Sequence, residues 1–336
     1  MQNGKRVLWM FILAVFLTSS IPPVGREQAA FAQGRKMKIA WVAVSGVMAP
    51  IWIAKEENLY QKYGLDADVV FVRGSQTATH AMLAGDLDIT VNSGSSVVNA
   101  GATGQDVVII ASLTNTPGLS LMSKIAMTAA NLKGKVIATD KPGTEPYNSL
   151  LLALKHLNLT PADVKINPIG PPETVFSAME NRVVDIGVLS PPILFKAESL
   201  GFQTVVDISA LGISSQGACI TTTRRYIRDH RENAVKFMKA FVEAIHLFKT
   251  DVGTSHKVME KYTKISDPEI LEKTRQYFGM KMIAQVPYPT REGLKTVVEV
   301  QAALNPKISS VNVDQLIDNS LLSELEQSGF IRSLYR

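Results

Sequence analysis

The sequence predicts an α/β protein made of two similar lobes, each a mostly parallel sheet covered by helices on both faces. The first observation is an internal repeat, because AMLAGDLDITVNS at residues 81–93 returns as AMENRVVDIGVLS at 178–190, shifted by 97 positions. The second is that the strand-like runs are uniformly apolar, as in parallel strands buried on both faces. The third is that these runs alternate with helical patterns, which favours two doubly wound sheets.

Length and composition agree with two domains. The chain has 336 residues, of which 46% are hydrophobic and 19% charged, so it can bury a sizeable core. Its formal net charge of +5 falls to +3 without residues 1–32, which carry Lys5, Arg6, Arg26 and Glu27. That mild and evenly spread charge gives no reason to expect nucleic acid or an anionic membrane as a partner.

The first 32 residues have the pattern of a secretory signal peptide. Lys5 and Arg6 precede the apolar run VLWMFILAVFL (7–17), and AFA (30–32) offers small residues for cleavage near Ala32. A membrane anchor is the alternative, but this run is well short of the roughly 20 residues that span a bilayer. We therefore expect an exported, periplasmic protein.

The first lobe is expected to alternate strands and helices from residue 37 onward. MKIAWVAVSG (37–46) ends in a glycine turn, and PIWIAKEENLYQKYG (50–64) has helical apolar spacing with Gly64 as its C-terminal cap. Two more strand and helix pairs follow, and the expected strands are at 66–72, 88–91 and 106–112.

The second lobe repeats this order. Its expected strands are at 134–143, 163–168, 185–188 and 203–209, and its first helix is at 146–159. Asp88 and Asp185 stand at the same helix-to-strand turn in the two copies. We interpret them as residues that satisfy backbone groups, rather than as catalytic acids.

Two strand-like runs, at 118–125 and 217–226, are expected to cross between the lobes. They place the first lobe at 33–120 and 221–336 and the second lobe at 121–220. The rest of the chain is helical in pattern and has no third sheet to cover, so we expect it to pack on the first lobe. Its helices are expected at 231–249, 267–280, 290–304 and 313–328.

A ligand site is expected between the lobes, because open parallel sheets bind ligands outside the carboxyl ends of their strands. The loops there are rich in Gly, Ser and Thr. Such residues cap helices, but they also leave amide groups that favour an anionic or strongly polar ligand, and the sequence leaves both roles open. The candidate ligand-binding residues are Ser45, Gly46, Val47, Ser75, Ser93, Gly94, Ser95, Ser96, Lys141, Gly143, Thr144, Tyr147, Ser190 and Pro191.

Motifs that would carry catalysis are absent from the sequence. It has no phosphate-binding loop with Lys and Ser or Thr, no H-E-x-x-H and no G-x-S-x-G. Its five histidines lack metal-ligand spacing, and Cys219 is the only cysteine, in an apolar run typical of a buried thiol. We expect no catalytic residue, no metal and no cofactor.

The order of several motifs resembles a known family. PIWIAKEENLYQKYGLDADVVFV, AGDLDITVNSGSS, LKGKVIATDKPGT, VVDIGVLSPP and VPYPTREGL follow one another as in the substrate-binding proteins of ABC importers, in the nitrate/sulfonate/taurine and thiamine-precursor-like group. The resemblance covers about residues 37–332. It implies a bilobal type II periplasmic-binding fold that closes on its ligand. It also implies ligand loops at 45–47, 93–96, 143–147 and 190–191, with Ser215 and Gln216 near the hinge.

The expected partners are a small-molecule ligand and the permease of an ABC transporter, and we expect a monomer. The alternative is an enzyme on the same fold, similar to the thiamine-pyrimidine synthase. That family member relies on a cysteine-rich iron-binding run with histidine, and Cys219 stands alone here. The ligand is left open between a sulfonate, a small carboxylate, a nitrate-like anion and an uncharged pyrimidine.

Overall fold

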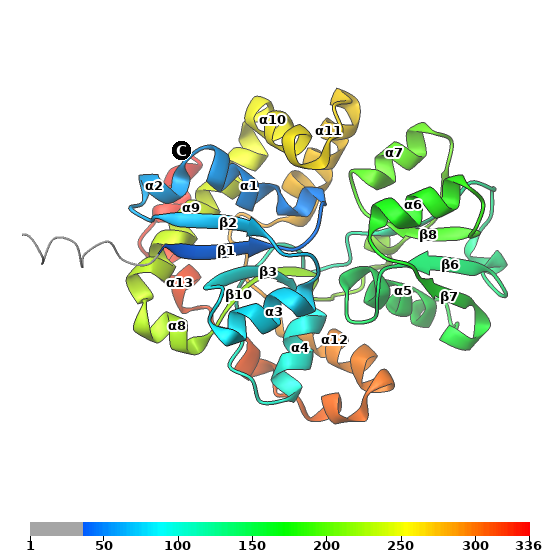
Figure 1. Cartoon of the computed structure of the whole chain (residues 1–336), viewed down its shortest axis with the longest axis horizontal. Coiled ribbons are helices and arrows are strands. Elements are labelled where there is room, and N and C mark those ends of the chain that lie inside the picture. Colours follow the sequence, from blue (N-terminus) through cyan, green and yellow to red (C-terminus); the bar gives the residue numbers. More distant parts are fainter. Residues whose placement is uncertain (1–35) are drawn as a thin grey trace, which may run out of the picture. The chain divides into compact units, whose positions relative to one another are not determined.

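The computed structural model describes residues 36–336, and the predicted signal peptide lies outside them. Two sheets of five strands each, both flanked by helices, make up this part of the chain (Figure 1). The predicted α/β fold with two sheet-centred lobes is therefore confirmed.

The first sheet has the strand order β2-β1-β3-β10-β4. Strands β1, β2 and β3 are parallel, and β10 runs antiparallel to its neighbours β3 and β4. Every residue of β3, β4 and β10 is buried, which explains why these runs are apolar without alternation. The bounds are β1 (Met37–Trp41), β2 (Ala67–Phe71), β3 (Ile89–Ser93), β4 (Val108–Ser112) and β10 (Ala218–Thr222).

The second sheet repeats this arrangement with the order β7-β6-β8-β5-β9. Strands β6, β7 and β8 are parallel, and β5 is antiparallel to β8 and β9. In both sheets the antiparallel strand is the first strand after the chain has passed over from the other sheet. The bounds are β5 (Ser120–Ser123), β6 (Val136–Thr139), β7 (Lys165–Pro168), β8 (Ile186–Leu189) and β9 (Gln203–Asp207).

The repeated aspartates have the same structural role in the two sheets. Asp88 Oδ2 accepts the amide hydrogen of Lys38 in β1 at 2.7 Å, and Asp185 Oδ2 accepts that of Val136 in β6 at 2.8 Å. Each carboxylate thus completes the hydrogen bonding of a neighbouring strand where that strand begins. The interpretation of both as backbone-satisfying residues is confirmed.

Helices cover the sheets in sequence order. The segment predicted as one helix at 50–64 is divided by Asn58, whose φ of 55° lies in the left-handed region. The first-sheet helices are α1 (Ala49–Glu56), α2 (Leu59–Lys62), α3 (Ser75–Ala84) and α4 (Gly94–Ala102), and the second-sheet helices are α5 (Glu145–His156), α6 (Pro172–Glu180) and α7 (Ile193–Ser199).

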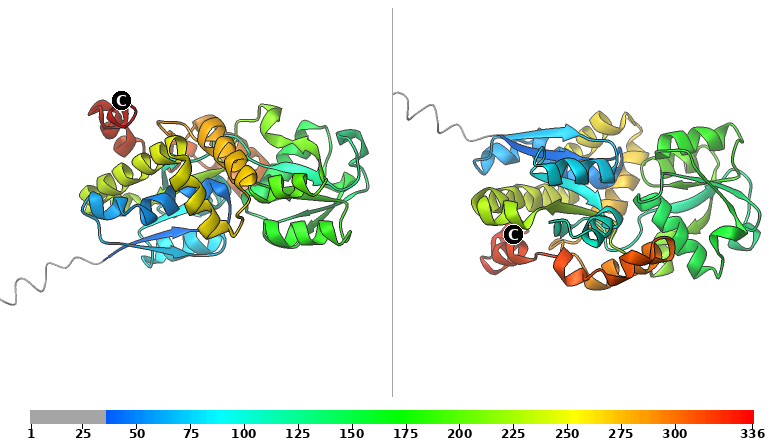
Figure 2. Two further views of the ribbon diagram at one scale, coloured as in Figure 1. Left: turned by 90° about the horizontal axis from the view of Figure 1, so that it is seen from above. Right: turned by 60° about the horizontal axis from the view of Figure 1, so that its bottom comes forward.

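The C-terminal helices pack on the first lobe as predicted, but some also reach the second. Helix α9 lies against α1, with Phe237 and Phe241 fully buried, whereas α12 contacts both α4 and α5 (Figure 2). Ile270 of α11 joins the core beside α7. The bounds are α8 (Arg224–Asp229), α9 (Arg231–Thr250), α10 (Val252–Thr263), α11 (Pro268–Arg275), α12 (Arg291–Leu304), α13 (Ser320–Gln327) and α14 (Phe330–Leu334).

The chain crosses between the sheets twice, at 113–119 and 208–217, and the two crossings are hydrogen-bonded to each other. The Gly217 amide donates to the Thr114 carbonyl oxygen at 3.0 Å, and the Ser215 amide donates to that of Asn115 at 3.0 Å. The Thr114 amide donates to Ala218 at 3.1 Å. The crossings therefore form a paired ribbon. No helix within residues 36–336 combines the length and apolar character of a membrane span.

Gly187 of β8 provides a test of packing in the second lobe. A Cβ there would lie 2.2 Å from Met179 Sδ and 2.7 Å from Val175 Cγ1, both in α6. Gly187→Ala should therefore lower the free energy of unfolding by about 1–3 kcal/mol, measured by urea denaturation. Gly253→Ala is the matched control, because its Cβ would meet only Asp251 Oδ1 at 3.6 Å, and equal stability of the two variants would contradict this packing.

Candidate functional site

A cavity of about 300 Å³ is lined by both lobes and by the paired ribbon. Its lining includes three groups of residues. The first-lobe group is Val42, Ser45, Val47, Phe71, Arg73, Ser75, Asn92, Ser93 and Ala218; the ribbon group is Thr114, Gly118 and Leu119; the second-lobe group is Asp140, Lys141, Thr144, Glu145, Pro171, Glu173 and Ser190. Phe278, from the C-terminal part of the chain, adds an aromatic ring to this lining.

About half of the candidate residues predicted from the sequence line this cavity. They come from the loop after β1, from the starts of α3 and α4, from the loop after β6 and from the end of β8. They are Ser45, Val47, Ser75, Ser93, Lys141, Thr144 and Ser190. The structure thus brings together, at one cavity, loops that follow equivalent strands of the two sheets.

The two lobes touch where Ser45 and Gly46 meet Pro191. The Gly46 amide donates to the Pro191 carbonyl oxygen at 3.2 Å, and Ser45 Oγ donates to the same oxygen at 3.2 Å. Ser45 Oγ also lies 3.4 Å from Ser190 Oγ. Another contact joins Ser93 Oγ to the Gly143 carbonyl oxygen at 3.5 Å. Polar groups that line the cavity thus also join the lobes.

Gly46 has no room for a side chain. A Cβ would lie 2.3 Å from Thr274 Cγ2 and 3.0 Å from Phe278 Cδ2. Thr274 belongs to α11, and Phe278 to the π-helical segment η5 (Gln276–Met282) that continues it. π-helical turns occur frequently at functional sites. Thr274 and Phe278 therefore pack against the Gly46 turn, and Phe278 also lines the cavity.

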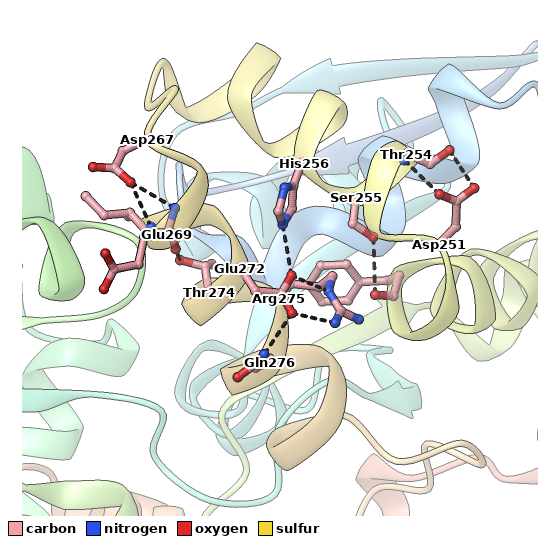
Figure 3. Close-up of polar contacts among 12 residues, drawn as sticks. Asp251, Thr254, Ser255, His256, Asp267, Glu269, Glu272, Thr274, Arg275 and Gln276 are labelled. Atoms are coloured by element: carbon pink, nitrogen blue, oxygen red, sulfur yellow. Dashed lines mark hydrogen bonds and ion pairs between the residues drawn. The ribbon is translucent and has the colours of Figure 1, made fainter.

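A charged cluster at Glu272 fixes α11 in place (Figure 3). The Arg275 guanidinium donates two hydrogen bonds to Glu272, of 2.8 and 2.7 Å, and His256 Nε2 lies 2.9 Å from the same carboxylate. The hydrogen bond from Arg275 is the largest influence that lowers the pKa of Glu272 to about 2. Arg275 Nη1 also donates to the Lys249 carbonyl oxygen at 2.6 Å, which ties α11 to α9.

The other candidate residues lie outside the cavity lining. Ser95 accepts a hydrogen bond from Asn148 of α5, Ser96 Oγ donates to the Ser93 carbonyl oxygen, and Gln216 Nε2 donates to Ser112 Oγ. Tyr147 packs with Leu151 in an apolar cluster. The complete set outside the lining is Gly46, Gly94, Ser95, Ser96, Gly143, Tyr147, Pro191, Ser215 and Gln216.

Several lining residues were not among the candidates. Asn92 directly precedes the candidate Ser93, and Glu145 lies inside the loop 143–147 that the family resemblance implies, although it was not singled out as a candidate. Thr114 comes from the first crossing, and Phe278 from a helical region with no pattern that distinguishes it from core. Trp41 and Trp52 pack against Tyr262 in the first-lobe core.

Glu145 is the first residue of α5 and lies against the paired ribbon. Its side chain is half-buried and lines the cavity, and its carboxyl group is surrounded closely enough for burial to be the largest influence on its pKa. A Cβ on Gly217 would lie 2.4 Å from Glu145 Oε1. Burial raises the pKa of Glu145 to about 7, and a hydrogen bond from the Gly118 amide opposes that shift.

Cys219 and the histidines offer no reactive constellation in this part of the chain. Cys219 lies in β10 with 0% exposure, and burial, followed by the nearby charge of Glu145, raises the pKa of its thiol well above the usual range. A thiol held in that state is a poor nucleophile. Within residues 36–336, no three His, Cys, Asp or Glu side chains are grouped so that they could hold a metal ion.

The raised pKa of Glu145 predicts a pH-dependent cost in stability. In the folded protein the carboxyl holds its proton up to about pH 7, whereas in the unfolded chain it loses the proton near its usual value of 4.5. The stability that the protonated carboxyl group contributes is therefore fully present below pH 4.5 and is lost as the pH rises through 7. Glu145→Gln should be more stable than the parent at pH 8 by on the order of 2 kcal/mol, with the difference shrinking towards pH 5.

Denaturant unfolding of both proteins at the two pH values measures this difference. Glu180→Gln removes an exposed carboxylate at the end of α6 and serves as the control, with little change expected at either pH. A parent protein as stable as Glu145→Gln at pH 8 would contradict the burial of this carboxyl group.

Sequence relatives are named as binding proteins. "Putative binding protein YtlA" of Bacillus subtilis is 26% identical over 253 residues, which cover 73% of this chain and 74% of that protein. A protein of the same description from Brucella abortus is 25% identical over 257 residues and covers 74% of this chain and 78% of its own.

Solved structures share the fold at lower identity. The aliphatic sulphonate binding protein SsuA from Escherichia coli matches with a TM-score of 0.70 and 18% identity, covering 84% of this chain and 92% of its own. The nitrate-binding protein NrtA from Synechocystis PCC 6803 matches with a TM-score of 0.65 and 15% identity, covering 87% and 88%. Both are periplasmic proteins by name. The fold expected from the family resemblance is therefore confirmed.

A family model described as NMT1/THI5 like matches residues 45–251. The match begins at the Ser45 loop, runs through both crossings and ends just after α9, so it includes most of the cavity lining. Since it spans more than half of the sequence, this chain belongs to the NMT1/THI5-like family.

Proposed function

We propose that this protein is an exported solute-binding protein that captures a small polar solute between its lobes and delivers it to an ABC importer. The observation that carries the proposal is the cavity lined by both lobes, with polar side chains at the carboxyl ends of equivalent strands. Family membership and the binding-protein names of its relatives support it. The ligand-binding components of import systems among the structures of like fold support the partner.

Closure supplies the mechanism. A solute in the cavity touches the first lobe at Ser45 and Ser93 and the second at Thr144 and Ser190, so it makes its full set of contacts only when the lobes are together. Such a solute stabilises the closed arrangement by the difference between its affinities for the two states. The permease of the importer would then recognise the outer surfaces of the two lobes in the arrangement that they adopt on closure.

The location and assembly follow from this role. The signal-peptide pattern at residues 1–32 supports export, with the mature chain starting near Gln33. We infer that the mature protein acts as a monomer of two lobes, residues 33–120 with 221–336 and residues 121–220. The strands β5 and β10 straddle these boundaries, because β5 begins at Ser120 and β10 at Ala218.

An enzyme on the same fold is the rival function. The thiol of Cys219 is fully buried and its pKa is raised, which supports carriage over thiol chemistry. The experiment that separates the two roles begins with a thermal-shift screen of small anions, amines and heterocycles on the mature protein. Native mass spectrometry then follows the stabilising compound. Its release unchanged supports carriage, and its conversion supports catalysis.

The hydroxyl groups at the lobe contact should contribute to affinity. The double variant Ser45→Ala and Ser190→Ala loses two hydroxyl groups that line the cavity and lie 3.4 Å apart where the lobes touch. We expect its affinity for the screened compound to fall by about 3- to 30-fold, as for the loss of one or two neutral hydrogen bonds. Calorimetry measures the change.

The control for this variant is Ser310→Ala, which removes an exposed hydroxyl remote from the cavity. Both variants should keep the melting temperature of the parent within a few degrees. Unchanged affinity in the double variant, with a folded protein, would contradict a role for these hydroxyls in binding.

A further inference from the structure

The charged residues that line the cavity are not distributed evenly. Arg73, Lys141 and Glu173 are exposed, so water screens their charges. Asp140 and Glu145 are half-buried, and the carboxyl group of Glu145 lies against the ribbon that carries Gly217 and Gly118. The charge that a bound solute meets at the ribbon is therefore that of an acid.

No cation balances this acid within residues 36–336. None of the ion pairs there includes Glu145, and no side chain among them donates a hydrogen bond to its carboxyl group. The Gly118 amide is its one favourable partner. A buried carboxylate without a cation is destabilising relative to a paired one, and groups of this kind concentrate at functional sites.

A second acceptor without a donor lines the same cavity. Asn92 is 1% exposed, and its Nδ2 donates to Thr221 Oγ1 at 2.8 Å. Its Oδ1, however, accepts no hydrogen bond from residues 36–336. Leaving a buried acceptor unpaired is destabilising, and a ligand group can supply the missing donor. The residues that line the cavity thus include an acid without a cation and an amide oxygen without a donor.

We propose that the solute presents a hydrogen-bond-donating nitrogen group, most favourably a cationic one such as an amidinium or ammonium, to Glu145 and Asn92. This inference rests on the proposed function and specifies the chemical class of the solute at the same site. A cationic donor would turn the costly free carboxylate into a charge-assisted pair. An oxyanion placed there would be repelled by Glu145, so this chain would differ from the sulphonate- and nitrate-binding proteins that share its fold.

Burial raises the pKa of Glu145 to about 7, so this carboxyl group changes its charge near neutral pH. Cys219 and Tyr277 carry electrostatic contributions from its charge, and burial raises the pKa of both groups, that of Tyr277 to about 12. The other charged lining residues are Arg73, Asp140, Lys141 and Glu173. A cation binds the ionised form of Glu145, so its affinity should fall as the pH drops below about 7.

Three probes of one shape and different charge test the proposal: benzamidinium, neutral benzamide and benzoate. Calorimetry at pH 8 on the mature parent should show benzamidinium binding at least about tenfold more tightly than benzoate, the size expected for a charge-assisted hydrogen bond. Glu145→Gln should abolish that preference. Glu180→Gln, which removes an exposed carboxylate outside the lining, should keep it.

Lowering the pH to 5 separates electrostatics from shape. The parent should lose benzamidinium affinity on acidification, whereas Glu145→Gln should show no such change. Circular dichroism and the melting temperature confirm that each variant is folded. Because Gln has nearly the shape of protonated Glu, a lost preference in a folded protein reports on charge.

Three results would overturn the proposal: no binding of benzamidinium at millimolar concentration, benzoate bound as tightly as benzamidinium, or a preference that survives Glu145→Gln. The failure of the ligand class is distinguishable from the failure of the proposed function. A sulfonate or carboxylate that binds, closes the lobes and is released unchanged would refute the donor group and leave solute carriage standing.

Discussion

The pairing of the two crossing segments is the constraint on which the remaining structure depends. The amides of Gly217 and Ser215 donate to the carbonyl oxygens of Thr114 and Asn115, so the chain leaves the first sheet and returns to it along one ribbon. The ribbon is both a floor for the cavity and the place where Glu145 is enclosed. Gly217 has to be glycine, because a Cβ would lie 2.2 Å from Thr114 Oγ1 as well as meeting Glu145.

Much of the fold could be predicted, because the same pattern of burial is written twice in the sequence. Asp88 and Asp185 and the apolar strands beside them fix equivalent turns in both sheets, and a repeat of this kind reports on topology. The C-terminal helices were only partly predictable. Their apolar stripes show that they pack, but the partner of α12 on the second lobe depends on tertiary contacts such as Val300 against Leu151.

The cavity was predictable where strands end and where Gly, Ser and Thr gather, as at Ser45, Ser93 and Ser190. Local pattern could not distinguish a Ser that faces the cavity from one used between elements, such as Ser95 against Asn148. Nor could it identify Glu145, because in the sequence this residue is an ordinary acidic N-terminus of a helix. Its position against a ribbon made of two distant segments makes it unusual. Phe278 likewise reaches the cavity from a third segment that is distant in the sequence.

The central claim is that the lobes move about the ribbon and close over a solute, and a distance between them tests it most directly. Cysteines introduced at Val183 and Val252, which are 67% and 44% exposed, can carry spin labels, while the buried Cys219 remains unlabelled. Double electron–electron resonance then compares the mature protein with and without a compound that raises its melting temperature. The account predicts a shorter and narrower distance distribution with the compound bound. An identical distribution at saturating compound would contradict it.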